Sequence, residues 1–542
     1  MKQSFLFFAM LLFVSAAFSQ PTQVWEARYN APANGRDISE DMAMDGQGNI
    51  YVTGTTTGAS GRTDITTIKY NSAGVQQWTA TYNGPSDSND YVYKIALDNQ
   101  GNVYLAGESQ GINTKADFTV IKYNTAGVEQ WVKRLNGAYN NDDSAEDIAI
   151  DAQGNVYVTG FLNDGSPTYD KYLTIKYSPD GTVLWQNTYN GPSLTDEAKF
   201  ITLDADGNVI VTGESGSGTT NNTPDYLTIK YNSAGIQQWI ARTGVFYRYE
   251  TVSGVVTDPA GNVYITGTEE RGSDSVNYLT VKYNQAGVQQ WSQKFLGEDQ
   301  NRDIAMCIVS DQNGNIFITG SSSKAGEGQN TGTVKYNTNG VLQWAAYFRG
   351  FHQTIVNQSQ YPFDMKIDAE GNVYVCGYDY STAYISKYNS SGVLQWFKNY
   401  GPTSGDDAFY AMVLDMNNNI FVTGPSYGSA ATSFEYATLK YSQPIGISPI
   451  SGEIPTEFSL SQNYPNPFNP VTNIEFSVPK SSFVKLTVFD VTGRELETLV
   501  SQTMSPGTYK ADWDASKYSS GVFFYTLTTD GFTQTKKMML IK

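Results

Sequence analysis

The sequence predicts an all-β protein in two parts, an eight-bladed β-propeller of four-stranded blades followed by a small Ig-like β-sandwich. Three observations support this fold class. A ten-residue pattern recurs eight times at a nearly constant spacing, which is typical of repeat architectures. Aromatic and β-branched residues alternate between Gly-containing turns in every copy, and no segment has a helical period. The composition then changes after Tyr441, where a second module begins.

The recurring pattern is Asp-x-x-Gly-Asn-aliphatic-aromatic-aliphatic-Thr-Gly, seen most clearly at Asp151–Gly160. Most copies lie 53 or 54 residues apart, and we interpret the first Asp of each as the cap of its own hairpin turn. These repeat Asp residues are Asp45, Asp98, Asp151, Asp204, Asp258, Asp311, Asp368 and Asp415.

Each copy divides into four short strands, which in the third copy are expected near 147–150, 155–160, 172–177 and 182–188. The ends of the repeat region predict how the ring closes. Trp25 belongs to a fourth strand with no first three before it, whereas Tyr436–Tyr441 is a third strand with no fourth after it. The N-terminal strand should therefore complete the last blade, and closure into a ring removes exposed sheet edges.

Two further residues mark every copy: a Lys before a Tyr in the third strand, and a Trp in the fourth. We expect the Lys to pair with acids or extend past aromatic rings, and the Trp to pack between blades. The repeat Lys residues are Lys69, Lys122, Lys176, Lys230, Lys282, Lys335, Lys387 and Lys440, and the repeat Trp residues are Trp25, Trp78, Trp131, Trp185, Trp239, Trp291, Trp344 and Trp396.

Units of Gly-Asn-Val-Tyr-Val-Thr-Gly followed by Lys-Tyr-Asn-x-x-Gly-x-x-x-Trp resemble the SBBP propeller repeats of exported bacterial proteins. The resemblance covers roughly residues 24–441. That family is usually described as seven-bladed, whereas eight copies are present here. The resemblance implies a fold and no common activity.

Residues 442–456 are rich in Pro, Gly, Ser and Ile and are interpreted as a linker between the propeller (20–441) and the second module (457–542). The module resembles the C-terminal sorting domain of type IX secretion cargo. The motif residues are Tyr464, Pro465, Asn466, Pro467, Phe468, Asn469, Pro470, Gly493, Gly521 and Lys537. The resemblance implies the type IX secretion machinery as a partner, removal of the domain, and release or attachment to surface lipopolysaccharide.

Residues 1–19 are typical of a signal peptide, with cleavage expected between Ser19 and Gln20. No later stretch is apolar enough for a transmembrane segment. The expected location is therefore secreted or at the outer cell surface, reached through the periplasm. A net charge of −18 argues against nucleic-acid binding, and since residues 457–542 hold eight acidic and eight basic side chains, the excess acid lies in the repeats.

An acid stands eight residues before seven of the eight repeat Asp residues, with Gln360 in the remaining copy. This position should ring the mouth of the central channel. Two interpretations stay open: an acidic ring that binds Ca²⁺ or a cationic ligand, or carboxylates that accept backbone N–H bonds and tie neighbouring blades. The candidate ring is Asp37, Asp90, Asp143, Asp196, Glu250, Asp303 and Asp407.

The tight turns share one face of the propeller, so the long loops, such as Phe161–Lys171 and Glu214–Asp225, share the other face with the connections between blades. We expect function on that second face. The most irregular segment is Phe348–Phe363, which contains the only histidine, His352. With one His, histidine-cluster metal sites are excluded and a Ser-His-Asp triad is disfavoured. Cys307 and Cys376 are expected to be two buried thiols rather than a disulfide.

These features favour an exported, non-enzymatic propeller that binds a glycan, a peptide or a surface partner. An extracellular polysaccharide hydrolase or lyase with carboxylates at the channel mouth is the first alternative, and a structural envelope protein is the second. No catalytic residues stand out, and no cofactor is expected beyond the calcium alternative above.

Overall fold

The computed structural model describes residues 20–542, apart from the gaps 166–169, 193–194, 217–222, 245–249, 272–274, 299–301, 351–359, 402–405, 430–432, 444–446, 452–454, 505 and 516–517. The expected signal peptide and most of the irregular segment around His352 thus lie outside the described residues. The described chain is all-β and forms two compact units, divided between Ser442 and Gln443. No helix in these ranges is long and apolar enough to span a membrane.

Unit 1 contains eight four-stranded antiparallel sheets, in an arrangement consistent with propeller blades. The innermost strands are β2 (Ile38–Met44), β6 (Asp90–Leu97), β10 (Ser144–Ile150), β14 (Asp196–Leu203), β18 (Glu250–Thr257), β22 (Ile304–Ser310), β26 (Gln360–Ile367) and β30 (Ala411–Leu414). The second strands are β3 (Ile50–Thr57), β7 (Val103–Gln110), β11 (Val156–Asn163), β15 (Val209–Gly216), β19 (Val263–Arg271), β23 (Ile316–Lys324), β27 (Val373–Asp379) and β31 (Ile420–Ser429).

The third strands are β4 (Thr63–Tyr70), β8 (Ala116–Tyr123), β12 (Asp170–Tyr177), β16 (Pro224–Tyr231), β20 (Ser275–Tyr283), β24 (Gly328–Tyr336), β28 (Thr382–Tyr388) and β32 (Ser433–Ser442). The outer strands are β5 (Gln76–Tyr82), β9 (Glu129–Leu135), β13 (Val183–Tyr189), β17 (Gln237–Thr243), β21 (Gln289–Phe295), β25 (Leu342–Phe348), β29 (Leu394–Tyr400) and β1 (Thr22–Tyr29). We number the sheets one to eight by their innermost strands, from β2 to β30.

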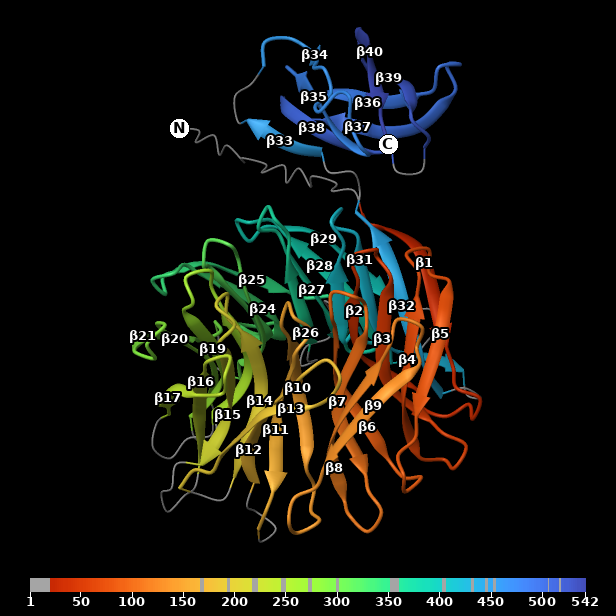
Figure 1. Ribbon diagram of the computed structural model, residues 1–542. Helices are drawn as coiled ribbons and strands as arrows, with labels where there is room; N and C mark the ends of the chain where they lie inside the picture. The colour runs from red at the N-terminus through yellow and green to blue at the C-terminus, as the bar shows by residue number, and fades with distance from the viewer. Residues whose placement is uncertain are drawn as a thin grey trace, which may run out of the picture. The chain divides into compact units, whose positions relative to one another are not determined.

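The sheets follow one another around a common centre, and the innermost strand of each contacts that of the next. The series returns to its start, because β30 of sheet eight contacts β2 of sheet one. In Figure 1 the red β1 lies beside the blue β32, and the two strands pair antiparallel from Thr22 with Ser442 to Tyr29 with Tyr436. The N-terminal strand therefore supplies the outer strand of the last sheet.

The repeat Asp and Lys residues make the contacts that the sequence predicts. The Asp45 carboxylate accepts hydrogen bonds from the backbone N–H groups of Gln47 (2.9 Å) and Asn49 (3.0 Å), and so caps its own turn. Lys69 Nζ lies 4.8 Å from the centre of the Tyr51 ring and 4.0 Å from Asp45. These predictions are confirmed.

The repeat Trp residues join neighbouring sheets. The Trp78 indole N–H donates to the Thr125 carbonyl of the next sheet (3.1 Å), and the Trp25 ring lies against Gly74 in the same way. Gly74 has φ +80°, and a side chain there would collide with the Trp25 ring, so glycine serves both the turn and the packing. The predicted packing of Trp between blades is confirmed.

Unit 2 consists of two four-stranded antiparallel sheets that share one core. One sheet has the order β33 (Ile447–Ser451), β38 (Gly507–Asp514), β35 (Val471–Val478), β34 (Ser459–Leu460). The other has the order β37 (Glu495–Met504), β36 (Ser482–Phe489), β39 (Gly521–Thr529), β40 (Phe532–Leu540). Residues 442–456, interpreted as a linker from the sequence, contain β33, which pairs with β38.

Candidate functional site

The seven candidate ring acids are fully buried, with 0% of each side chain exposed. The Asp143 carboxylate accepts hydrogen bonds from the N–H of Gly137 (2.6 Å) in the connection from the preceding sheet and of Asn163 (2.7 Å) at the end of β11. Asp37 and Asp303 accept equivalent pairs of backbone N–H bonds. Gln360, which takes this position in the seventh copy, accepts an N–H bond from Thr331 (3.2 Å). Burial raises the pKa of the Asp143 carboxyl to about 6.

This geometry favours the carboxylates as clasps that join the sheet connections to the second strands. At Asp37, Asp143 and Asp303 a cation could bind only by displacing backbone donors from buried oxygens, which is costly. In the described part of the chain, no group of three or more His, Cys, Asp or Glu side chains is arranged to hold a metal ion. Calcium binding by the ring stays a prediction.

As clasps, these carboxylates should leave the melting temperature of unit 1 the same in millimolar calcium and in chelator. Calorimetry of the purified chain in both buffers measures this. The Glu129→Gln variant, altered at an exposed position of β9, controls for general effects of charge. A melting temperature that rises in calcium for the wild-type chain would support the metal interpretation instead.

A second set of carboxylates lies on the innermost strands and joins sheets directly. Asp147 accepts the N–H of Ile148 (2.8 Å) and that of Ile201 on the next sheet (2.9 Å). Asp41 and Asp364 make the same pair of bonds, and we call these three the axial carboxylates. They lie four residues after Asp37, Asp143 and Gln360, a position that the sequence did not single out.

Charged side chains from several sheets converge near the axial carboxylates. Lys94 of sheet two lies 3.9 Å from Asp41, and this carboxylate raises the pKa of the Lys94 ammonium above its usual value. Lys366 is bound by Asp364 at 2.7 Å. Burial raises the pKa of Asp147 to about 6, although Lys94 opposes the shift.

On the face of the long loops, polar side chains of different chemistry form a cluster across sheets two to four. It begins at Tyr93, which lies beside Glu108 and is 36% exposed. It continues through Glu146 to Lys199, which lies 3.8 Å from Glu146 and 2.6 Å from Glu197. We call this set the loop-face cluster: Tyr93, Glu108, Glu146, Glu197, Lys199 and Glu214.

β-Bulges place the central members of this cluster. Each innermost strand of sheets one to seven has a register shift near its start, and Tyr93, Glu146 and Lys199 are the extra residues at three of them. A bulge residue is released from strict alternation and can turn its side chain away from the sheet. The corresponding residues elsewhere are Glu40, Ser253, Met306 and Phe363, so this position differs from copy to copy while the framework repeats.

Burial and mutual repulsion set the charge state of the cluster. Burial raises the pKa of Glu108 to about 7, and the nearby Glu146 adds to the shift. Burial raises the pKa of Glu214 to about 7 as well, with Lys199 opposing and Glu197 contributing. The Glu146 and Glu197 carboxylates outweigh the effect of burial on Lys199 and raise its pKa. The cluster therefore gains negative charge near neutral pH.

Both cysteines are free thiols. Cys376 is fully buried and donates to the Phe409 carbonyl, whereas Cys307 is half-buried on the innermost strand β22. Burial raises the pKa of Cys307 to about 11, so this thiol stays protonated. The expectation of two thiols agrees with the geometry, but Cys307 is less buried than predicted.

Comparison with known families agrees with both sequence resemblances. Three segments match the family described as Beta-propeller repeat (SBBP), at residues 33–62, 77–113 and 130–160. Residues 462–542 match the Secretion system C-terminal sorting domain. The chain thus carries SBBP propeller repeats and a type IX sorting domain, and the latter implies export and interaction with the type IX secretion system.

A curated relative is the Uncharacterized WD repeat-containing protein L264 of Acanthamoeba polyphaga mimivirus, 24% identical over 366 residues. The match covers 60% of this chain and 22% of that protein's length. Among solved structures, the chain is similar to PorZ, an essential surface component of the type IX secretion system of Porphyromonas gingivalis. The identity is 12%, the TM-score 0.32, and the coverage 94% of this chain and 74% of PorZ.

Another solved structure that the chain resembles is the polysaccharide lyase Uly1, with 11% identity and a TM-score of 0.37. That match covers 79% of this chain and 94% of the lyase. At these identities and TM-scores, the likeness assigns no activity, ligand or partner to this chain.

Proposed function

We propose that this protein is an exported binding module, in which residues 20–441 form a closed eight-bladed propeller and residues 457–542 an Ig-like sorting domain. The pairing of β1 with β32 and the contact of β30 with β2 support the closed ring. The shared core of the two sheets of unit 2 supports the sandwich. After export, the chain is released or attached to surface lipopolysaccharide.

The ligand site is the loop-face cluster. The observation that carries this proposal is the contiguous path from Tyr93 and Glu108 through Glu146 to Lys199, built from residues that the repeat does not require. Residues that vary on a rigid repeated scaffold are where binding specificity normally resides. The buried ring acid Asp143, by contrast, has both carboxylate oxygens engaged by backbone N–H groups.

The chemistry of the cluster fits a ligand that presents an amino group. Four carboxylates face one ammonium, so the cluster attracts positive charge. A cationic ligand would relieve the repulsion that adds to the effect of burial on the pKa of Glu108 and Glu214. The exposed ring of Tyr93 offers an apolar surface beside these charges. Amine-bearing glycans and basic peptides share this chemistry.

Binding should therefore weaken at least tenfold, about 1.4 kcal/mol, in the Glu108→Gln, Glu214→Gln double variant. Affinity for wild type should also rise from about pH 6 to about pH 8, since both carboxyls ionise with a pKa of about 7. Arrays of amine-bearing and N-acetylated glycans and of basic peptides identify the ligand, and calorimetry measures the affinity. The control is Glu129→Gln, and equal binding by the double variant contradicts the site.

Hydrolysis or cleavage of an extracellular polysaccharide is a second candidate, favoured by one observation. Burial raises the pKa of the Glu108 carboxyl to about 7, and Tyr93 lies beside this carboxyl, as suits a general acid near neutral pH. Release of reducing or unsaturated ends that disappears in Glu108→Gln would support an enzyme. Binding without turnover supports the binding module.

A further inference from the structure

The segment Tyr464–Pro470 of the sorting domain divides into an anchor and an exposed part. The anchor is Phe468, whose ring is 2% exposed and lies 5.6 Å, centre to centre, from the buried ring of Trp513. Its backbone N–H donates to the Met539 carbonyl (2.9 Å), and its carbonyl accepts the N–H of Ile541 (2.9 Å). Phe468 thereby covers the outer edge of the last strand, β40, which would otherwise be open to pairing.

Residues beside the anchor hold the preceding loop in one conformation. The buried Asn463 side chain and the Thr472 hydroxyl both donate to the Pro465 carbonyl, at 3.0 and 2.8 Å. Tyr464 exchanges two backbone hydrogen bonds with Asn473, each 2.9 Å long. Because Asn463 also hydrogen-bonds to Thr472 at 2.9 Å, the carbonyl and both of its donors form one connected network.

This network presents an aromatic ring to solvent. The Tyr464 side chain is 79% exposed, and Pro465 and Pro467 beside it are exposed as well. Within the described residues the Tyr464 ring takes no part in the aromatic contacts of the core, which centre on Trp513. A rigidly held, exposed tyrosine loses little conformational freedom on binding, and tyrosine is enriched at binding hot spots.

We propose that Tyr464, with Pro465 and Pro467, is the contact through which the type IX secretion machinery binds this domain. The proposal rests on the export role of the domain and adds a division of labour within the motif. Phe468, Asn463 and Thr472 maintain the fold, and the partner binds the Tyr464 loop. The sorting domain itself implies that partner.

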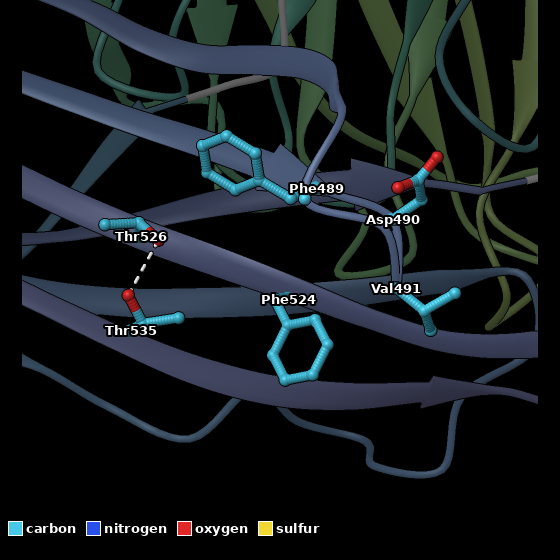
Figure 2. A pocket seen from close by; sticks show the side chains of 7 residues that line it. Phe489, Asp490, Val491, Phe524, Thr526 and Thr535 are labelled. Atoms are coloured by element: carbon cyan, nitrogen blue, oxygen red, sulfur yellow. Dashed lines mark hydrogen bonds between the residues drawn. The ribbon is translucent and has the colours of Figure 1, made fainter.

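Unit 2 has another surface that could serve as the contact, which makes a matched control available. Figure 2 shows a hollow at the turn after β36, lined by Phe489, Asp490, Val491 and Gly493 and, from β39 and β40, by Phe524, Thr526 and Thr535. The Thr526 and Thr535 hydroxyls hydrogen-bond across it at 2.8 Å. Val491 is 67% exposed, so a substitution there removes an apolar group of the hollow at a small cost in folding.

The test compares export of four full-length variants and a truncation in a bacterium that has type IX secretion, by blotting medium, cell surface and periplasm. We expect Tyr464→Ser and Tyr464→Gln to reduce the exported fraction at least tenfold, with the chain accumulating in the periplasm. Tyr464→Phe, which keeps the ring, and Val491→Ser should be exported like wild type. Deletion of residues 457–542 should abolish export.

Melting temperatures of the purified variants separate recognition from folding. The Tyr464 variants should melt within about 1 °C of wild type, because substitutions at exposed positions are nearly neutral. Normal export of Tyr464→Ser and Tyr464→Gln, with the truncation retained, overturns this inference and leaves the export role intact. Loss of export in Val491→Ser alone also overturns it, and normal export of the truncation overturns both.

Discussion

A chain that lacks β1, Thr22–Tyr29, is expected to lose the cooperative unfolding transition of unit 1 and to aggregate. The deletion removes the whole outer strand of sheet eight and exposes the edge of β32. It also removes Trp25, whose ring contacts Phe421 of sheet eight at 5.9 Å and Tyr70 of sheet one at 6.4 Å. Removing a packed Trp costs up to about 3–5 kcal/mol, when whole domains are stable by only about 5–15 kcal/mol.

Urea unfolding followed by Trp fluorescence, with light scattering for aggregation, measures the effect. The best control restores the strand at the other end of the repeats, by attaching residues 22–29 after Tyr441 through a turn copied from Asn71–Gly74. Since every other sheet joins its third and outer strands by such a turn, this permuted chain should recover most of the lost stability. An unchanged urea midpoint in the deleted chain would show that the ring does not depend on β1.

The parts of the fold that repeat could be predicted from the sequence. The turn at Asp45, the cation–ring contact of Lys69 and the packing of Trp78 on the next sheet are local or nearest-neighbour features. Each is set by a few residues at fixed spacing, so eight copies reinforce the prediction. The same pattern predicted that the N-terminal strand containing Trp25 completes the last sheet.

The loop-face cluster could not be predicted from the sequence, because it depends on β-bulges that have no recognisable sequence pattern here. The acids eight residues before the repeat Asp residues recur, but recurrence fits a structural contact as well as a ligand site, and the Asp143 carboxylate accepts two backbone N–H bonds. The informative signal was variation at one position of the repeat, and not recurrence. Tyr93, Glu146 and Lys199 occupy a single position of the repeat with three different chemistries.

The sequence also did not predict a set of polar contacts that recurs at every second sheet. Axial carboxylates occur in sheets one, three and seven, at Asp41, Asp147 and Asp364, and each bonds the backbone of the following even-numbered sheet. Arginines paired with acids of the third strand occur in sheets two, four and eight, at Arg134, Arg242 and Arg28. These particular polar contacts thus recur at every second sheet, with sheets five and six as the exception. In that pair, the Ser253 hydroxyl donates to the Ala305 carbonyl across the same interface.

Unit 1 is expected to be more stable in mild acid than at alkaline pH, the reverse of the usual behaviour of salt-bridged carboxylates. Burial raises the folded-state pKa to about 6 for Asp64, Asp143, Asp147 and Asp170, and to about 7 for Glu40, Glu108 and Glu214. The folded chain therefore binds these protons more tightly than the unfolded chain does. The resulting stability is complete below the unfolded pKa values and is lost as the pH rises through 6 and 7.

Other carboxyl groups set the pH below which the stability of unit 1 falls again. Hydrogen bonds lower the pKa of Asp45 and Asp204 despite their burial, so the stability that these carboxylates contribute is lost as the pH falls below about 4. The melting temperature of unit 1 should consequently be highest near pH 5. Between about pH 5 and pH 8 it should fall by roughly 3–6 °C, since each unit of pKa shift is worth about 1.4 kcal/mol before solvent screening.

Calorimetry of the wild-type chain across this range should be compared with the triple variant Glu40→Gln, Glu108→Gln, Glu214→Gln. Glutamine has nearly the shape of protonated glutamate and stays neutral, so the triple variant should melt like wild type near pH 5 and above it at pH 8. Its melting temperature should thus vary less with pH. Relief of the net charge of −18 on acidification also favours the folded state, but that effect persists in the variant. An identical pH profile for both chains would assign the whole dependence to net charge and refute the role of the buried carboxyls.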